Sequence, residues 1–257
     1  ALIVSSLILI LISRIPLRIV YRSVKPLIFI LLFTVIINIF WTSGETLLFE
    51  WRFIRIYLEG IMNAVFMIVR ILTLIIGTSG RYEFKNKGIN VFLEALNRLN
   101  RDKNLKKKVL AFVNVPSWVG DPREDLLERL NSKKIFTTPL TCPLITHWLH
   151  NMTHDQVLDM LKYLGMGNNP EDKVKVIFVP CYLDGFDGII NKHYYDIVLC
   201  EDLTVYPSYY EPWGYTPLES VAFKVPTITT DLAGFGLWAN TLKGGKYSEI
   251  EDGVKVI

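Results

Sequence analysis

The sequence predicts two dissimilar parts: an α/β domain with a parallel sheet over residues 80–257, preceded by an all-α transmembrane segment of two to three helices over residues 1–79. In the longer part, short apolar runs alternate with amphipathic helical patterns, which is typical of strands and helices in succession. In the shorter part, long apolar stretches carry almost no charge. The hydrophobic content of 51% and the mean hydropathy of +0.30 average over these two regimes.

The charge distribution argues against a nucleic-acid partner. Residues 1–79 hold seven Lys and Arg against three acidic residues, and the whole chain has a net charge of only +3. This basic excess lies among apolar segments rather than on a soluble face, so we expect no nucleic-acid footprint.

Cysteine usage and aromatic content exclude two other classes. Aromatic residues make up 12% of the chain, too many for a disordered protein. Cys142, Cys181 and Cys200 are an odd number, and each stands singly in or beside an apolar run. We therefore expect buried free thiols in a reducing compartment rather than a disulfide scaffold.

Three apolar stretches suggest contact with a lipid bilayer. Ala1–Ser13 has no charged side chain and resembles the end of a helix, and Pro26–Thr42 is an uncharged run suited to a transmembrane helix. Tyr57–Thr78 is long enough to cross, but it carries Glu59 and Arg70. It is therefore either a transmembrane helix whose Arg70 faces protein or a polar cavity, or an amphipathic helix that lies on the membrane.

The loops between these stretches set an expected orientation. The loop between the first two stretches has four basic residues and no acid, which favours the cytoplasmic side. After two further crossings, residues 80–257 would also be cytoplasmic. We therefore expect a membrane-associated chain whose second part lies in the cytoplasm.

Alternating patterns in the second part predict a parallel sheet covered on both faces. The predicted helices are Gly88–Arg101, Asp125–Asn131, Asp155–Leu164, Tyr194–Leu199 and Pro217–Phe223, and the predicted strands are Val109–Val115, Val174–Val179, Leu203–Pro207 and Thr227–Thr230.

The stretch YPSYYEPWGYTPLES carries the strongest chemical signal. It leads from a predicted strand into a helix whose start, TPLE, has the form of a capping box from Thr216 to Glu219. Free amides of Tyr215, Thr216 and Leu218 would form an anion pocket at the carboxyl end of the strand. Gly214 would let the backbone approach the ligand closely.

Two acids bracket this stretch. Glu211 and Glu219 are separated by seven residues, so both can point toward the same pocket. Carboxylates beside a phosphate site are useful where they accept hydrogen bonds from sugar hydroxyls, which favours a nucleotide-sugar. From the residues alone, the alternative stays open that Glu219 only caps the helix and Glu211 is a solvated loop acid.

Three histidines have a spacing that could suggest a metal site. His147, His150 and His154 would share one face of a continuous helix. Because Thr153 can begin a new helix near His154, that continuity fails, and we predict no metal.

The first part resembles a membrane transporter family. The runs SRIPLRIVYRSVKPLIFILLFTVIINIFWTSGETLLF and IRIYLEGIMNAVFMIVRILTLIIGTS are similar to the membrane core of the energy-coupling factor (ECF) transporter T component, over about residues 13–79. The basic motifs with which that family engages its ATPases lie on later helices that this sequence does not contain. The resemblance therefore implies a truncated membrane segment that couples nothing to ATP hydrolysis.

The second part resembles the carboxyl-terminal domain of glycogen synthase, in the lineage of animal, fungal and some bacterial enzymes. The resemblance rests on SGRYEFKNKG, VKVIFVP, SYYEPWGYTPLES and PTITTDLAGFG. It implies a Rossmann-like half of a GT-B glycosyltransferase that retains anomeric configuration. The implied donor is a nucleotide-sugar, UDP-glucose rather than ADP-glucose, and the glucan acceptor would bind through an N-terminal domain that is missing. We therefore expect donor binding without turnover.

The same resemblance implies roles for individual residues. Glu211 would lie near the transferred glucose and Glu219 toward the ribose. Arg81 and Lys87, in the segment RYEFKNKG, would contact the donor diphosphate, and Tyr194 would stack on the base. Without the motif, Arg81 and Lys87 would be two solvated charges at a domain edge.

The junction near Thr78–Gly80 is abrupt, with no linker between the two regimes. We interpret it as two unrelated pieces joined by a natural fusion, by engineering or by an assembly error. The chain is then either a glucosyltransferase domain with a membrane fragment or a transporter component with a passenger domain.

Overall fold

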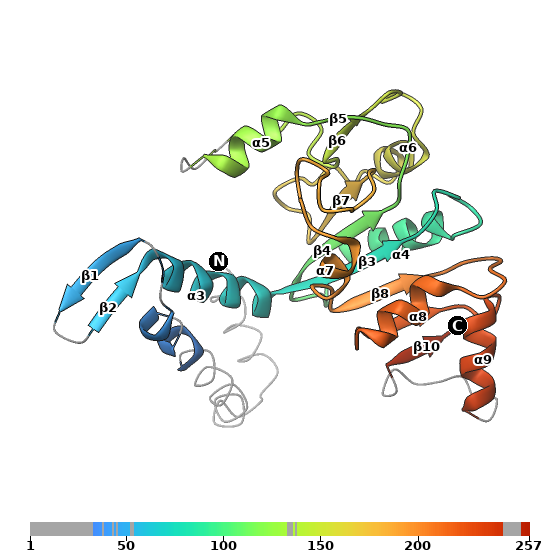
Figure 1. The fold of residues 1–257 in the computed structure, drawn as a ribbon. Helices are drawn as coiled ribbons and strands as arrows, with labels where there is room; N and C mark the ends of the chain where they lie inside the picture. Colours follow the sequence, from blue (N-terminus) through green and yellow to red (C-terminus); the bar gives the residue numbers. More distant parts are fainter. Residues whose placement is uncertain are drawn as a thin grey trace, which may run out of the picture. The chain divides into compact units, whose positions relative to one another are not determined.

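The computed structural model describes residues 33–37, 39–42, 44, 46–51, 54–132, 136, 138–243 and 253–257. The chain divides into two compact units, Ala1–Leu72 and Thr73–Ile257, and each is described by itself (Figure 1). The predicted apolar segment Ala1–Ser13 lies outside the described residues. Of Pro26–Thr42, residues 33–37 and 39–41 are helical.

The first unit contains a β-hairpin and a helix. Strands β1 (Leu47–Trp51) and β2 (Ile54–Tyr57) pair antiparallel, and α3 (Leu58–Leu72) follows directly. Glu59, in the first turn of α3, accepts a hydrogen bond from the backbone amide of Thr46 at 3.1 Å. Among the residues that the structure describes, no helix combines the length and apolar character needed to cross a membrane.

The expectation of one membrane helix over Tyr57–Thr78 is wrong. Helix α3 has 15 residues, a rise of about 22 Å, whereas a bilayer core is about 30 Å thick. The rest of the run is strand β3 (Thr73–Ser79), which lies inside a parallel sheet. Such a strand is apolar because both of its faces are buried. The two units accordingly divide after Leu72, ahead of the change in composition at Thr78–Gly80.

The second unit is built on a six-stranded parallel sheet, which confirms the predicted parallel architecture and its four predicted strands and adds β3 and β10. Its strands are β3, β4 (Lys108–Asn114), β7 (Val174–Val179), β8 (Leu203–Tyr206), β9 (Thr227–Thr229) and β10 (Val254–Val256). They lie in the order β10-β9-β8-β3-β4-β7 (Figure 1). The chain winds outward from β3 in one direction and then from β8 in the other. This doubly wound order has its reversal between β3 and β8, the position at which such sheets bind ligands.

Six helices accompany the sheet in the described part of this unit: α4 (Ile89–Arg101), α5 (Glu124–Asn131), α6 (Gln156–Tyr163), α7 (Tyr194–Val198), α8 (Tyr215–Ala222) and α9 (Gly234–Leu242). The first five overlap the five predicted helices. Helix α9, strand β10 and the antiparallel pair β5 (Val119–Pro122) and β6 (His147–Leu149) were not predicted. The two strands of that pair are too short to show a period.

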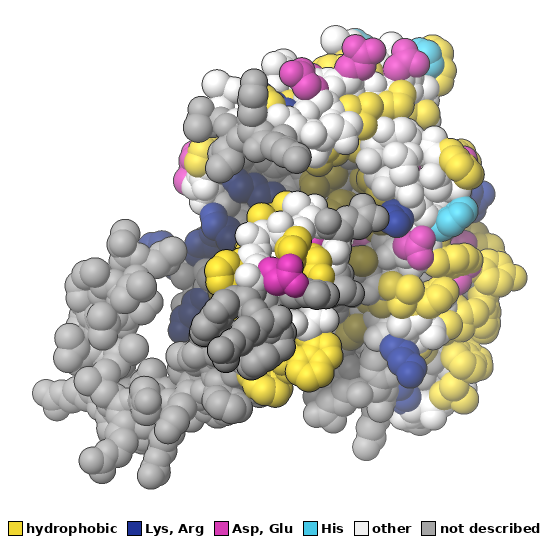
Figure 2. Space-filling view, turned by 60° about the vertical axis from the view of Figure 1, so that its left-hand side comes forward, with side chains coloured by type: hydrophobic (Ala, Val, Ile, Leu, Met, Phe, Trp, Pro, Cys, Tyr) yellow, Lys and Arg dark blue, Asp and Glu magenta, His cyan; other side chains and the backbone are white. Residues whose placement is uncertain are grey.

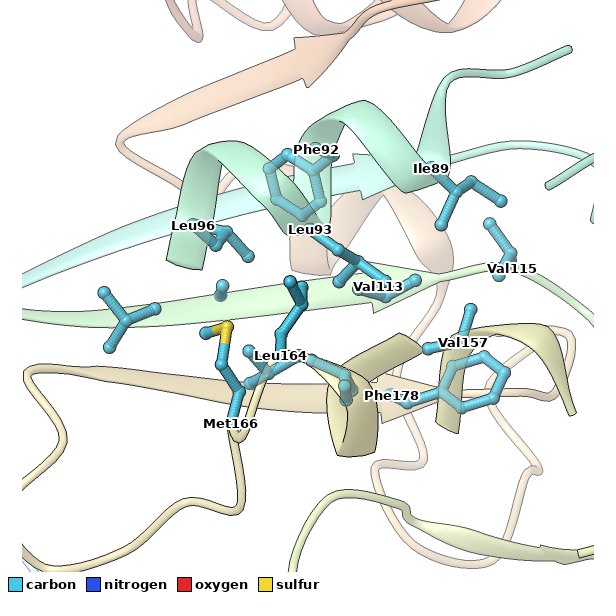
Figure 3. Close-up of a cluster of buried hydrophobic side chains, with 14 of the residues drawn as sticks. Ile89, Phe92, Leu93, Leu96, Val113, Val115, Val157, Leu164, Met166 and Phe178 are labelled. Atoms are coloured by element: carbon cyan, nitrogen blue, oxygen red, sulfur yellow. The ribbon is translucent and has the colours of Figure 1, made fainter. Parts of the chain in front are cut away.

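The main core lies between α4, α6 and the strands β4 and β7 (Figure 3). Apolar residues spaced three and four apart on α4, including Phe92, Leu93 and Leu96, form one stripe that faces the sheet. Val113 of β4 and Phe178 of β7 are fully buried against this layer. This packing fixes the carboxyl ends of β4 and β7, from which the loops of the candidate site begin.

A smaller core lies beside β10. Phe235 and Ala239 of α9 are buried with Val254 and Val256, and Trp213 packs against them. Because crossovers between parallel strands are right-handed, reversing the winding direction puts α8 and α9 on the face opposite α4 and α6. Figure 2 shows that charged side chains of both signs are interspersed with apolar ones on one face of the molecule.

Gly88 lies where the loop after β3 contacts the loop after β8, at the reversal of the strand order. It is the residue before α4, with a left-handed φ of 65°. A Cβ atom at this position would stand 1.9 Å from the carbonyl oxygen of Pro207, in the loop after β8. The absent side chain therefore lets the two loops touch.

We predict that Gly88→Ala lowers the free energy of unfolding by about 3 kcal/mol, because it adds a backbone clash to the cost of a left-handed alanine. Gly165→Ala is the matched control, since Gly165 also has a left-handed φ, of 70°, but no atom lies within 4 Å of its added Cβ. It should cost only about 1 kcal/mol. Urea unfolding measures both, and equal losses would contradict the close approach of the loops.

Candidate functional site

A cavity of about 460 Å³ lies at the carboxyl ends of the central strands of the second unit. Its walls come from the segments that follow β3, β4 and β7, and from the starts of α7 and α8. The lining residues are Ser79, Gly80, Arg81, Tyr82, Asn114, Pro116, Cys181, Tyr182, Leu183, Asp184, Tyr194 and Thr216. Three residues predicted from the sequence, Arg81, Tyr194 and Thr216, are thus brought to one cavity.

Lys87 and Glu211 do not line this cavity, but they form an ion pair, and Lys87 interacts electrostatically with the lining residue Arg81. Their side chains are 13% and 16% exposed, so the pair is largely removed from water. The backbone amide of Tyr209 also donates to the carbonyl of Asn86 at 2.8 Å, which holds the two loops together. Burial lowers the pKa of Lys87, the nearby Arg81 lowers it further, and Glu83 opposes both.

Arg81 keeps its charge accessible. Its side chain is 73% exposed, and its Nε lies 3.2 Å from Glu83 Oε1. Arg81 and Thr216, the latter in the first turn of α8, line the same cavity. Of the two predicted cations, Arg81 lines the cavity, whereas Lys87 does not and is paired with Glu211.

The predicted capping box at the start of α8 is wrong. The helix begins at Tyr215, and its N-cap is Gly214 with a left-handed φ of 97°. Thr216 consequently lies inside the first turn, where its side chain cannot cap. By position, the amides left free by the helix are those of Gly214, Tyr215 and Thr216, since Pro217 has no N–H. Leu218 is not among them, in contrast to the expectation from sequence.

Glu219 has a different contact from the one that the capping box required. Its Oε1 accepts a hydrogen bond from the hydroxyl of Tyr195 at 3.3 Å. The ring of Tyr195 in turn packs on Phe223, with centroids 5.0 Å apart. Glu219 is not a lining residue of the cavity in this geometry, so its predicted role toward a ribose stays a prediction.

Tyr194 is anchored by a chain of hydroxyl groups. Its OH lies 2.7 Å from Ser79 Oγ, which lies 3.3 Å from the Tyr206 OH, which lies 2.8 Å from Ser220 Oγ. Ser220 donates its single proton to the Thr216 carbonyl at 3.1 Å. Ser220 must therefore accept from Tyr206, Tyr206 from Ser79, and Ser79 from Tyr194. Tyr194 is thus the first donor of the chain. The chain ties the cavity wall to the first turn of α8.

Several cavity residues were missed from sequence. Ser79 and Gly80 were overlooked because β3 was assigned to a membrane helix. Asn114 ends a strand without any motif, and Cys181–Asp184 belongs to an irregular segment after β7. The useful signal is topological, because residues that follow parallel strands meet at one sheet edge.

The three histidines do not share a helix. His147 belongs to strand β6, and His154 precedes α6. His147, Cys181 and Asp187 do approach one another within 4.8 Å. However, three backbone amides donate to the Asp187 carboxylate, and His147 Nε2 lies 2.7 Å from the Asp187 carbonyl. These hydrogen bonds fix the turn of residues 187–191 and hold it against His147 of β6.

The cysteines divide by environment. Cys181 is buried, and burial raises the pKa of its thiol to about 12. Cys142 and Cys200 are exposed, contrary to the expectation of buried thiols. Each has an apolar neighbour that is exposed as well, Pro143 beside Cys142 and Leu199 beside Cys200, so an apolar neighbour in sequence did not indicate burial.

Comparison with known proteins decides the family. The glycogen synthase family model matches residues 52–135 and 123–249. The chain belongs to the glycogen synthase family. It is 31% identical over 226 residues to glycogen [starch] synthase of Neurospora crassa, 31% over 229 residues to isoform 2 of Saccharomyces cerevisiae, and 30% over 213 residues to the human liver enzyme.

These matches cover 66%, 66% and 64% of this chain but only 32%, 32% and 30% of the relatives. The chain thus spans about a third of the glycogen synthases that it resembles. The family match begins at residue 52, inside the stretch that the sequence assigned to a transporter. Residues 52–79 therefore belong with the glycogen synthase part, which corrects the junction expected at Thr78–Gly80.

We predict that Tyr206→Phe lowers the free energy of unfolding by about 1–3 kcal/mol, because it leaves the buried hydroxyls of Ser79 and Ser220 without their common partner. Tyr163→Phe is the control, since Tyr163 is 87% exposed. Thermal or urea unfolding measures both changes. A Tyr206→Phe protein as stable as the control would show that the hydroxyl chain carries no stability.

Proposed function

We propose that the second unit is the donor-binding domain of a retaining glucosyltransferase, with UDP-glucose as its donor. The observation that carries the proposal is the cavity at the sheet reversal, which joins Arg81 to the start of α8 and whose Arg81 interacts electrostatically with Lys87 of the Lys87–Glu211 pair. A cation, free helix amides and a carboxylate together match a sugar linked to a diphosphate.

The diphosphate would lie between Arg81 and the first turn of α8. A guanidinium binds two phosphate oxygens at once, and the helix start adds the amides of Gly214, Tyr215 and Thr216. As the glycosidic bond breaks, negative charge builds on the leaving diphosphate. Donors already fixed in place stabilise that charge with little rearrangement.

The Lys87–Glu211 pair would serve both ends of the donor. An ammonium group has three N–H donors, so Lys87 can hold the Glu211 carboxylate and also a phosphate oxygen. The carboxylate keeps acceptor capacity for a hydroxyl of the transferred glucose. The ion pair thereby sets the distance between the sugar and the diphosphate.

Tyr194 and Glu219 are proposed contacts for the nucleoside. Tyr194 lines the cavity and its hydroxyl is held by Ser79, so its ring would be a rigid stacking surface for a base. Glu219 would turn from Tyr195 toward a ribose hydroxyl, a short movement for a side chain on the second turn of α8.

The acceptor side is proposed from the family alone. A GT-B enzyme closes two Rossmann-like domains around donor and acceptor, and a glucan would reach the donor through the other domain. The chain matches about a third of the length of its relatives, and the proposal for it concerns donor binding alone.

We predict that Arg81→Ala weakens UDP binding at least about tenfold, the effect of losing charge-assisted hydrogen bonds to phosphate. Isothermal titration calorimetry of the full chain with UDP measures this. Lys85→Ala is the matched control, since Lys85 is an exposed cation of the same loop and does not line the cavity. Equal affinities of the two variants would remove Arg81 from the site.

We predict that Glu211→Gln weakens the binding of UDP-glucose several-fold more than the binding of UDP, because only the former offers sugar hydroxyls to the carboxylate. UDP itself is the control ligand, measured by the same titration. If both ligands lose affinity equally, Glu211 acts only by holding Lys87.

For the chain before residue 52, we propose contact with a lipid bilayer, with residues 80–257 in the cytoplasm. The support is the uncharged run Pro26–Thr42 and the basic loop before it. The alternative origin, a piece of an ECF transporter component, rests on the sequence resemblance of that stretch. Alkaline carbonate extraction of cell membranes tests the proposal. Full release of the chain into the supernatant would overturn it.

A further inference from the structure

Glu201 is a buried acid directly beneath the candidate site. It lies between α7 and β8 and is only 6% exposed. Its carboxyl group occupies the space above Gly77 of β3, where an added Cβ would stand 2.0 Å from Oε1 and 2.2 Å from Oε2. The absence of a side chain at residue 77 therefore makes the room for this carboxyl group in the middle of the sheet.

Its hydrogen-bond partner is a residue of the cavity wall. Asn114 Nδ2 donates to Glu201 Oε1 at 3.3 Å, and Asn114 lines the cavity. The carbonyl of Asn114 also accepts from the amide of Gly80 at 3.4 Å, immediately before Arg81. The Asn114 side chain consequently links Glu201 to the cavity wall and, through this backbone contact, to the loop that carries Arg81.

The contact between Glu201 and Asn114 lacks one hydrogen-bond donor. Asn114 Oδ1 is buried and has no hydrogen-bond partner among the residues that the structure describes. An ionised Glu201 has only acceptors to offer, whereas a neutral carboxylic acid has an O–H as well. One proton on Glu201 would let the acid and the amide share two hydrogen bonds. Burial raises the pKa of Glu201 to about 8, and the bond from Asn114 opposes that shift.

In the described part of the chain, no charged group contributes to the pKa shift of Glu201, so none takes the place of that proton. Tyr206 of β8 interacts electrostatically with Glu201, and burial raises the pKa of its hydroxyl, so it stays neutral. Tyr194 of α7, linked to Tyr206 through Ser79, is also kept neutral by burial, which raises its pKa. Asp202 directs its Oδ2 to the amide of Ile75, at 2.8 Å.

We propose that Glu201 is a positioning residue of the donor site that acts as a neutral carboxylic acid: it holds Asn114 in place, and release of its proton to solvent puts a negative charge under the cavity and weakens binding of an anionic donor. The ligand part of this proposal rests on the proposed function, because it takes UDP as the occupant. A like charge in a buried region repels a diphosphate more strongly than one in water would.

Titration of the full chain with UDP at several pH values between 7 and 9.5 tests the proposal against Glu201→Gln. Glutamine has the same shape as the neutral acid and supplies an N–H donor. At pH 7 the two proteins should bind UDP alike. At pH 9.5 the wild type should bind about tenfold more weakly than the variant. Deprotonation of Lys87 affects both proteins and cancels in the ratio.

A ratio of the two dissociation constants that does not change with pH would overturn the proposal, since a purely structural role shifts affinity equally at every pH. Glu128→Gln on the exposed face of α5 is the matched control and should follow the wild type throughout.

A ligand-free measurement separates this inference from the proposed function. A native pKa above the unfolded value means that the folded protein holds more protons, so stability is lost as pH rises toward 8. Unfolding of the wild type should become easier relative to Glu201→Gln between pH 6 and 8, and the difference should then level off. Parallel profiles would refute the neutral acid, whereas absent UDP binding at pH 7 would refute only the proposed donor. If Glu201→Gln does not fold, the carboxyl carbon shift of wild-type Glu201, followed by NMR across the same pH range, decides protonation.

Discussion

The contact between two loops at the reversal of the sheet is the constraint on which the site depends. Gly88 lies under the carbonyl of Pro207 because it has no side chain, and this contact brings together the segments after β3 and β8. These segments are far apart in sequence but follow neighbouring parallel strands. Their approach places Lys87 against Glu211 and leaves Arg81 and the first turn of α8 on one cavity.

Charge in this region is balanced before any ligand arrives. Lys87 is paired with Glu211, and Arg81 lies near Glu83. A buried charge is stable only with a partner, so Glu201, which has a neutral amide rather than a cation beside it, retains its proton. In the proposed site, attraction for an anion would therefore come from the guanidinium of Arg81 and the free amides of α8.

The sequence predicted most of the second unit for a simple physical reason. Helix α4 has its apolar residues three and four apart, and β7, VKVIFV, is a short run rich in β-branched residues, so the first pattern favours a helix and the second a strand. The run TLIIGTS is different, because a strand buried on both faces and a segment inside lipid have the same composition. Reading it as part of a membrane helix displaced the unit boundary and hid Ser79 and Gly80 from the predicted site.

The sequence by itself determined the parallel α/β architecture and the presence of a helix over TPLES, since these follow from local periodicity, and family resemblance predicted site roles for the motif residues Arg81, Lys87 and Glu211. Only the tertiary structure decided that Lys87 pairs with Glu211, that Gly214 rather than Thr216 caps α8, and that Glu201 lies under the cavity beside Asn114. Such contacts join strands distant in the chain, and their energies depend on burial, which local sequence does not encode.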